Sequence, residues 1–279
     1  GNDRVQYELP EYQVALLKEI AAVNSNVIAV VMNGGAVAMP WADEVKAILE
    51  CFYGGQGIGR AIVKVISGEV NPSGHMPVSV PAFREQIISD ENFAEQTEQV
   101  TYREGMFMGY RGYETKKIPV QFPFGFGLSY TEFKIEFKGI ETSEKELAVE
   151  MKVTNIGDTY AGKEVVQIYA SLPQTEVKKE YRRLVGYAKT KLLQPGEAET
   201  LKITVGQKEL AYFSEEKHQW IVEKGIYGVW TGNSSVSLEY SSTVKVEQSV
   251  SLEDTCVLEN TAEIEEELWK TYECRKTTA

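Results

Sequence analysis

The stretch KKIPVQFPFGFGLSY, residues 116–130, divides this chain into two parts with different sequence patterns. Pro119 and Pro123, together with the glycines between the aromatic residues, prevent regular secondary structure. The phenylalanines and the tyrosine of the same stretch favour burial. The sequence therefore predicts a packed connector, which we place at residues 116–132.

Helical and strand patterns alternate before the connector. After Pro10, apolar residues recur at helical spacing up to Val23, and a proline suits a first helical turn because its missing N–H would be unpaired there. The run NVIAVVMN (26–33) is apolar almost throughout, which is typical of a strand buried on both faces. These two patterns together predict an α/β domain.

Two further segments before the connector have helical spacing. They are ADEVKAILECFYGG (42–55) and GRAIVKVISG (59–68), with a short strand end at CFYGG between them. Gly68 is placed to end the second helix. We therefore assign residues 1–115 to the α/β part of the chain.

Period-two alternation replaces the helical spacing after the connector. ELAVEMKVTN (146–155) and ETLKITV (199–205) predict half-buried strands, and turn sequences such as NIGD (155–158) lie between such segments. This pattern predicts an all-β sandwich over residues 133–245. The apolar positions expected on the inner face are Leu147, Val149, Met151 and Val153 in the first strand, and Leu201, Ile203 and Val205 in the second.

The last segment, residues 246–279, forms an extension with its own pattern. Asn260 is a suitable N-cap, Glu263 follows three residues later, and Ile264 and Leu268 begin an apolar stripe. The extension is therefore predicted to contain a helix.

Composition excludes several classes of function. A net charge of -12 argues against a nucleic-acid partner, which clustered Lys and Arg would bind. Cys51, Cys256 and Cys274 lie far apart, so neither a disulfide framework nor a metal knuckle is indicated. No run reaches the length of a membrane helix, and the chain contains no signal peptide, so we expect no membrane partner and leave cytoplasmic and secreted locations open.

No motif in the chain indicates a cofactor or a metal. Gly54 and Gly59 have the spacing of a phosphate-binding loop, but Arg60 and Ala61 replace the Lys and the hydroxyl that such a loop requires. The two histidines, His75 and His218, lack the neighbours of a nucleophilic triad or a metal site, and we expect them at the surface or in packing roles.

Carboxylates and aromatic rings remain as candidate functional groups. Paired carboxylates carry out glycoside hydrolysis, but the sequence alone cannot say which acidic side chains meet. Six aromatic residues could stack on sugar rings or could equally pack in the core or the connector. They are Trp41, Tyr102, Phe107, Tyr110, Tyr113 and Trp220.

Long ordered segments of the chain resemble the C-terminal half of glycoside hydrolase family 3, the family of bacterial and fungal β-glucosidases. The resemblance covers GGAVAMPWADEVKAILECFYGGQGIGRAIVKVISGEVNPSGHMPVSVP (34–81), YREGMFMGYRGYE (102–114) and FPFGFGLSYTEF (122–133). It continues in VTNIGDTYAGKEVVQIYA (153–170) and RRLVGYAKTKLLQPGE (182–197), within the fibronectin type III-like domain of many family members.

The resemblance implies an enzyme in which two carboxylates come from different domains. In the family, a (β/α)8 barrel carries an aspartate nucleophile, and the α/β sandwich domain contributes the acid/base. The resemblance implies that residues 1–115 are the C-terminal part of this sandwich domain. The family signature Glu-Gly-x-Asp-Arg aligns with Gly1, Asp3 and Arg4, so the acid/base glutamate would fall just before Gly1. No catalytic residue is therefore expected in this chain. Asp3 and Arg4 are candidates for the edge of the substrate site, or form only a loop ion pair.

These observations favour the C-terminal portion of a retaining β-glucosidase that acts on terminal β-linked sugars and is inactive without its barrel. The expected partners are that barrel and a carbohydrate substrate, with no cofactor. A homodimer or a poorly soluble half-domain is also predicted, because the strand NVIAVVM (26–32) would present an unpaired edge and an uncovered apolar surface. The alternative is a structural or carbohydrate-binding module without catalytic function.

Overall fold

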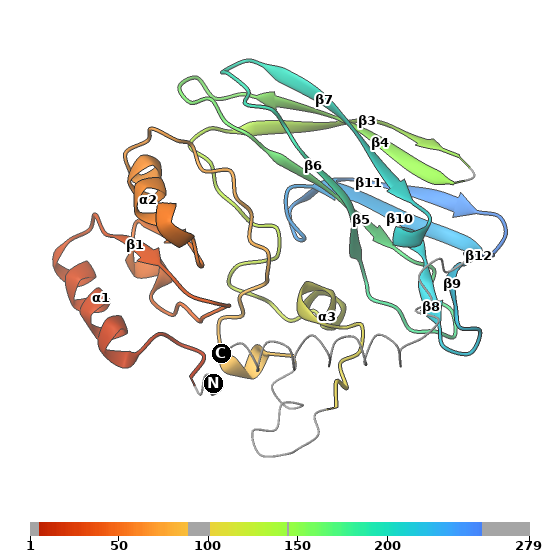
Figure 1. The fold of residues 1–279 in the computed structure, drawn as a ribbon, viewed down its shortest axis with the longest axis horizontal. Helices are drawn as coiled ribbons and strands as arrows, with labels where there is room; N and C mark the ends of the chain where they lie inside the picture. The colour runs from red at the N-terminus through yellow and green to blue at the C-terminus, as the bar shows by residue number, and fades with distance from the viewer. Residues whose placement is uncertain (1–5, 89–100, 144, 253–279) are drawn as a thin grey trace, which may run out of the picture.

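The computed structural model describes residues 6–88, 101–143 and 145–252 of the chain. Figure 1 shows an α/β part, coloured red to orange, beside a β-sandwich, coloured green to blue. The predicted helix of the C-terminal extension lies outside the described residues. Within them, every helix is too short or too polar to cross a membrane. The predicted fold class, an α/β part followed by an all-β part, is confirmed.

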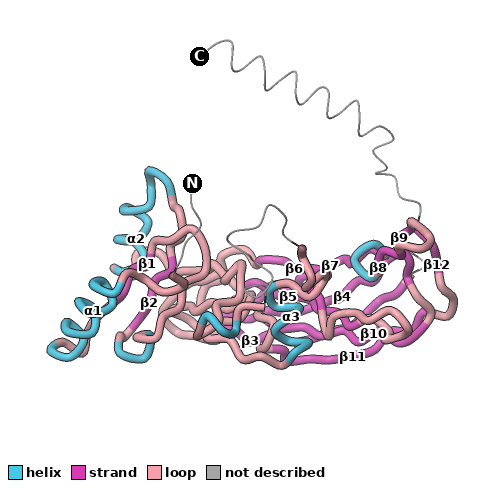
Figure 2. Tube along the Cα trace, turned by 90° about the horizontal axis from the view of Figure 1, so that it is seen from below, coloured by secondary structure: helices cyan, strands magenta, loops and turns pink. Residues whose placement is uncertain are grey.

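Within residues 6–88, the described region of the α/β part has two parallel strands and two α-helices. Helix α1 (Glu11–Val23) follows Pro10, as the sequence predicts, and α2 (Ile58–Ile66) ends just before Gly68, whose φ of 76° suits a left-handed helix end. Strand β1 (Ile28–Val31) pairs with β2 (Ala47–Glu50) in a parallel register. In Figure 2 the two strands lie between α1 and α2.

The helix predicted for residues 42–55 is wrong. The chain there forms a short 3-10 helix, η1 (Ala42–Glu44), and then strand β2. Ala47–Glu50 has the local spacing of a helix, but pairing with β1 fixes the extended conformation, because tertiary contacts outweigh weak local propensity. Phe52 then adopts a φ of 45°, which turns the chain after the strand.

The expectation that β1 is buried on both faces is also wrong within the described residues. Ala29 and Val31 are 8% and 5% exposed and pack in the core, whereas Ile28 and Val30 are 46% and 39% exposed. Side chains of a strand alternate between its faces, so one whole face of β1 is left partly uncovered by the described residues.

The core of the α/β part centres on Trp41, which is fully buried. Met39 packs beside it, and Val14 and Leu17 of α1 close the cluster from outside. The side chain of Gln121 donates to the Met39 carbonyl at 2.8 Å and accepts from the Met39 amide at 3.3 Å. The connector is thereby tied to this core.

The connector runs extended beside residues 76–80 and pairs with them through the backbone. The Val80 amide donates to the Phe122 carbonyl at 2.8 Å, and the Met76 amide donates to the Phe126 carbonyl at 2.7 Å. The rings of Phe122 and Phe126 are in contact, with centroids 5.9 Å apart. The predicted burial of its aromatic residues is therefore confirmed in part, while Leu128 and Tyr130 stay exposed.

The β-sandwich consists of antiparallel strands in two main sheets. One sheet has the order β3-β4-β7, the other β11-β10-β5-β6, and a small third sheet has the order β12-β9-β8. The strands are β3 (Phe133–Thr142), β4 (Glu146–Asn155), β5 (Val165–Ser171), β6 (Arg183–Lys189), β7 (Ala198–Gly206), β8 (Tyr212–Ser214), β9 (Gln219–Val222), β10 (Gly225–Gly232), β11 (Leu238–Val246) and β12 (Val250–Leu252).

The core of the sandwich lies between the two main sheets. The predicted inner face of β4 is confirmed, because Leu147, Val149, Met151 and Val153 are all at most 3% exposed. The predicted inner residues of β7 belong to the same cluster, and β5 contributes Val166 and Ile168 from the opposite sheet.

Four short elements complete the described structure. Helix α3 (Gly109–Lys116) leads into the connector and ends at Lys117, whose φ is 55°. Further 3-10 turns are η2 (Gly55–Gly57), η3 (Arg84–Gln86) and η5 (Lys208–Leu210).

Candidate functional site

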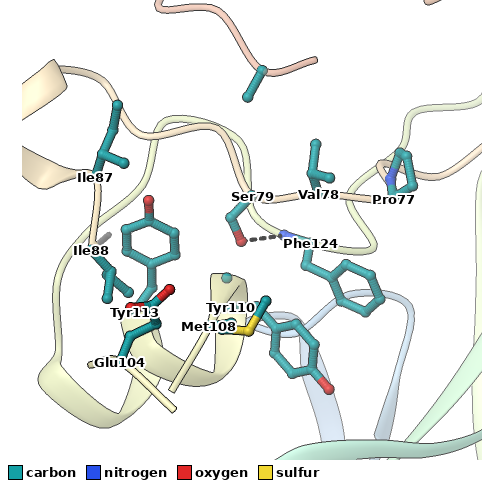
Figure 3. A pocket seen from close by; sticks show the side chains of 12 residues that line it. Pro77, Val78, Ser79, Ile87, Ile88, Glu104, Met108, Tyr110, Tyr113 and Phe124 are labelled. Carbon is teal, nitrogen blue, oxygen red and sulfur yellow. Dashed lines mark hydrogen bonds between the residues drawn. The ribbon is translucent and has the colours of Figure 1, made fainter. Parts of the chain in front are cut away.

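Two adjoining hollows lie where α3 meets the connector and residues 77–79. The larger has a volume of about 400 Å³ and the smaller about 280 Å³. Both are lined by Ser79, Tyr110 and Tyr113. Figure 3 shows the larger hollow, where aromatic and aliphatic side chains from α3, the connector and the chain before α3 surround the Ser79 hydroxyl.

The walls of the larger hollow are fixed by packing and by backbone hydrogen bonds. Tyr110 stacks on Phe124 with ring centroids 4.5 Å apart, and its hydroxyl accepts a hydrogen bond of 2.7 Å from the Leu184 amide of β6. The Ser79 hydroxyl accepts from the Phe124 amide at 3.2 Å, as drawn in Figure 3. Tyr110 therefore serves packing as well as lining the hollow.

A buried ion pair fastens α3 to the sandwich beside the smaller hollow. The Glu114 side chain is 9% exposed, and its Oε2 lies 3.1 Å from Nε and 3.0 Å from a terminal nitrogen of Arg182. The guanidinium also packs on the rings of Tyr181 and Trp230, 4.8 and 5.4 Å from their centroids. Burial raises the pKa of Glu114, and Arg182 partly opposes this rise.

The hollows do not bring two carboxylates together. Among the described residues, Glu104 is the single carboxylate that lines the larger hollow, and Glu114, already paired with Arg182, is the single carboxylate of the smaller one. Among the described residues, no cluster of three metal-binding side chains was found. The hollows therefore offer aromatic and aliphatic walls rather than an acid/base pair.

Asp3 and Arg4, the predicted residues at the edge of the site, lie outside the described residues. The described residues begin just after them, at residue 6, and Tyr7 is already held by hydrogen bonds to other segments. The Tyr7 hydroxyl donates to the Pro81 carbonyl at 3.1 Å, and the Ala38 amide donates to the Tyr7 carbonyl at 3.2 Å. The segment that follows Asp3 and Arg4 is thus held against the loop after β1.

Packing accounts for most of the aromatic residues considered as sugar platforms. Trp41 is fully buried, Tyr113 is 7% exposed, and burial raises the Tyr113 pKa. Trp220 packs edge-on against Phe213 with centroids 5.5 Å apart. Tyr102, at 76% exposed, is the one member of the predicted set among the exposed large apolar residues of the described chain.

The glycine-rich stretch at residues 54–59 has a structural role, and Cys51 is the one cysteine within the described residues. A Cβ at Gly54 would lie 2.1 Å from the Ile58 side chain, so this glycine allows the tight turn into α2. Cys51 is a free thiol. Cys256 and Cys274 are outside the described residues.

The histidines occupy different environments. His218 is exposed in a turn with a φ of 49°, whereas His75 is largely buried between the two parts of the chain and contacts Glu164. Surface or packing roles were predicted for both histidines, and no local sequence pattern indicated the contact between His75 and Glu164.

Several buried charges were missed from the sequence. Besides Glu114 and Arg182, the amino group of Lys179 is fully buried, 2.6 Å from Glu223 and 2.9 Å from the Pro173 carbonyl. One local pattern could have indicated a buried charge: a charged residue directly beside an apolar strand, as Glu164 is before β5.

Two family profiles match the chain. Residues 1–130 match the glycosyl hydrolase family 3 C-terminal domain, and residues 164–235 match the fibronectin type III-like domain. The chain is 38% identical over 258 residues to thermostable beta-glucosidase B of Acetivibrio thermocellus, a match that covers 90% of this chain and 34% of that enzyme. It is 37% identical to an exo-alpha-(1->6)-L-arabinopyranosidase of Bifidobacterium breve, covering 88% of this chain and 33% of that enzyme.

The structure is similar to that of a beta-glucosidase from Kluyveromyces marxianus in complex with glucose. The TM-score is 0.86 at 35% identity, and the match covers 90% of this chain and 30% of that one. The chain therefore spans about a third of the length of these relatives.

Proposed function

Because this chain carries the C-terminal domain of glycoside hydrolase family 3 followed by the fibronectin type III-like domain, we propose that it forms the C-terminal portion of a retaining β-glucosidase-type enzyme. The full enzyme would hydrolyse terminal β-linked sugars. One observation carries the proposal: the match extends over 90% of the chain in both sequence and structure.

The proposed chemistry needs two carboxylates on opposite sides of the scissile bond. In retaining glycosidases they are about 5–5.5 Å apart, one attacking the anomeric carbon and the other protonating the leaving oxygen. We place the nucleophile on the barrel and the acid/base glutamate one position before Gly1. Asp3 and Arg4 would then border the substrate site, where a carboxylate–guanidinium pair can hold the loop in shape.

We further propose that the chain by itself does not turn over substrate. The support is chemical: the two hollows of the described structure have one lining carboxylate each, and that of the smaller hollow is neutralised by Arg182. A nucleophile and a proton donor must act on one anomeric carbon. Neither hollow supplies both.

An exchange experiment tests the proposal. The K. marxianus enzyme, truncated to lack the portion similar to this chain, is compared with the same truncated enzyme fused to this chain. We expect the fusion alone to hydrolyse an aryl β-glucoside, with the isolated chain as the inactive control. An aryl α-L-arabinopyranoside in the same assay tests the sugar, because one relative acts on that class. Hydrolysis by the isolated chain, or a folded but inactive fusion, contradicts the proposal.

We also propose a homodimer when the chain is studied alone. The uncovered face of β1 exposes Ile28 and Val30, and α1 exposes Leu16 and Val23, at 59% and 87%. Apolar surface of this kind favours association. Light scattering should give a mass above one chain that falls for Val30→Lys, and a monomer at high concentration would argue against the dimer.

A further inference from the structure

His75 lies at the seam where the three parts of the molecule meet. It belongs to the loop after α2, and its side chain is 13% exposed. Its Nε2 is 3.2 Å from Oε1 of Glu164, which precedes β5 of the sandwich. Its Nδ1 contacts the carbonyl oxygen of Gly125 in the connector. One imidazole ring therefore joins the α/β part, the connector and the sandwich.

Both partners of the ring are hydrogen-bond acceptors. A backbone carbonyl has no proton to donate, and neither has an ionised carboxylate. Each ring nitrogen must therefore carry a proton for both contacts to be hydrogen bonds, which is the charged imidazolium form. A neutral ring has one N–H, so it would set a lone pair against either the Gly125 oxygen or the Glu164 carboxylate.

The space around the ring is narrow. A Cβ at Gly127 would lie 2.5 Å from the Gly74 carbonyl and 3.3 Å from the His75 ring, so the connector passes directly over the loop. Glu164 is itself oriented, since one of its oxygens accepts from the Val165 amide at 2.7 Å. The carboxylate cannot turn away from the ring without losing that bond.

The charged groups around the pair come from three elements. Lys189, at the end of β6, donates to the Ser73 carbonyl at 2.6 Å and opposes a charge on His75. Lys163 interacts with Lys189, and Glu239 of β11 with Glu164. Burial acts to lower the pKa of His75, but the hydrogen bonds to Glu164 and Gly125 outweigh it, so the pKa is raised above its ordinary value.

We propose that His75 is a proton-operated latch between the α/β part and the sandwich, closed when the imidazole is charged and loosened when it is neutral. Bonds between groups without a titratable proton also cross the seam. Asn71 donates to the Ala161 carbonyl at 3.1 Å and accepts from the Tyr130 amide at 2.8 Å. Loss of the proton therefore weakens the seam locally and leaves the two parts attached.

The direction of the pH effect follows from linkage. The group binds its proton more tightly in the folded state than in the unfolded state, where its pKa is about 6.5. The stabilisation is fully present below that value and is lost as the pH rises through the folded-state pKa. Each unit by which the pKa of His75 in the folded state exceeds its unfolded-state value means that the charged imidazole stabilises the folded state tenfold more than the neutral one does.

The first test is a histidine NMR titration of the full chain. The chain has two histidines, so His75→Gln and His218→Asn assign the two imidazole signals. We expect the His75 signal to titrate with a midpoint above about 6.5. A midpoint at or below that value overturns the proposal, and this reading needs only the wild-type fold.

The second test measures the seam itself by hydrogen exchange. The Met76 amide, bonded to the Phe126 carbonyl, and the Gly125 amide, bonded to the Met76 carbonyl, report on the closed latch. After correction for intrinsic exchange, we expect their protection to fall relative to β4 amides as the pH passes the His75 midpoint.

Variants separate the latch from general pH effects. His75→Lys, which keeps a positive charge, should remove the fall in protection, and so should His75→Gln. Gln should lower protection at acidic pH, whereas Lys should retain more of it. His218→Asn is the matched control and should behave as wild type. An unchanged pH dependence in His75→Gln contradicts the latch.

Discussion

Replacing Arg182 with Met should destabilise the fold strongly, because it leaves a buried carboxylate without its counter-ion. The Glu114 side chain is 9% exposed, accepts a hydrogen bond of 3.1 Å from Nε of Arg182, and forms an ion pair of 3.0 Å with a terminal nitrogen of the same guanidinium. Removing one partner of a buried ion pair costs about 3–5 kcal/mol. We expect a loss of this size at pH 7, measured by urea unfolding.

The double variant Glu114→Gln/Arg182→Met should be less affected than the single one. The double variant removes the buried charge along with its partner. The loss of unfolding free energy then comes only from lost packing and from burying the neutral amide that Glu114→Gln introduces. A coupling free energy of about 2 kcal/mol is expected from the double-mutant cycle. Lys202→Met is the matched control: its bond to Glu141 is 2.7 Å long, but both side chains are more than half exposed, so no measurable loss is expected.

The pH dependence gives an independent check on the role of burial. Burial raises the pKa of Glu114 above 4.5, and loss of Arg182 raises it further. The folded state then binds a proton that the unfolded state releases, so Arg182→Met should be destabilised less at pH 5 than at pH 7. This reasoning would be refuted if Arg182→Met lost the same free energy of unfolding at both pH values. It would also be refuted if Arg182→Met were as stable as the double variant.

Two further substitutions test packing and backbone conformation, each with a nearby control. Leu193→Ala, at a fully buried position, should lose about 2–5 kcal/mol in urea unfolding, whereas Leu192→Ala, at 50% exposed, should stay within about 0.5 kcal/mol; similar losses would contradict the assigned core. Gly125→Ala should lower the melting temperature, because Gly125 has a φ of 80° and a Cβ would lie 2.3 Å from the Gln167 side chain, whereas Gly35→Ala meets nothing within 4 Å and should not.

Elements with contrasting faces could be predicted from the sequence. The alternation in β4 is clear because its Leu147 face meets the core and its Glu150 face meets solvent. The helix prediction for residues 42–55 was wrong because Ala47–Glu50 is short, and its apolar spacing suits a helix as well as a strand. Only pairing with β1, from elsewhere in the chain, decides between the two.

The charged contacts at the seam could not be predicted, because their partners are far apart in sequence. Arg182 and Glu114 are 68 residues apart, and no local pattern marks either as buried. The same holds for His75, which looks like an ordinary turn residue until the fold brings Glu164 beside it. Asp3 and Arg4 rest on the family resemblance alone and remain a prediction.

The connector does not behave as a spacer between two independent modules. Its backbone is bonded to residues 76–80 on one side, and on the other the Gln167 side chain of β5 donates to the Gly125 carbonyl. A recombination event that joined this sandwich to a foreign partner inside residues 116–132 would break the contacts that the connector makes with both neighbours. When these domains are exchanged during evolution, the connector and the loop that it pairs with should therefore be inherited together as one unit.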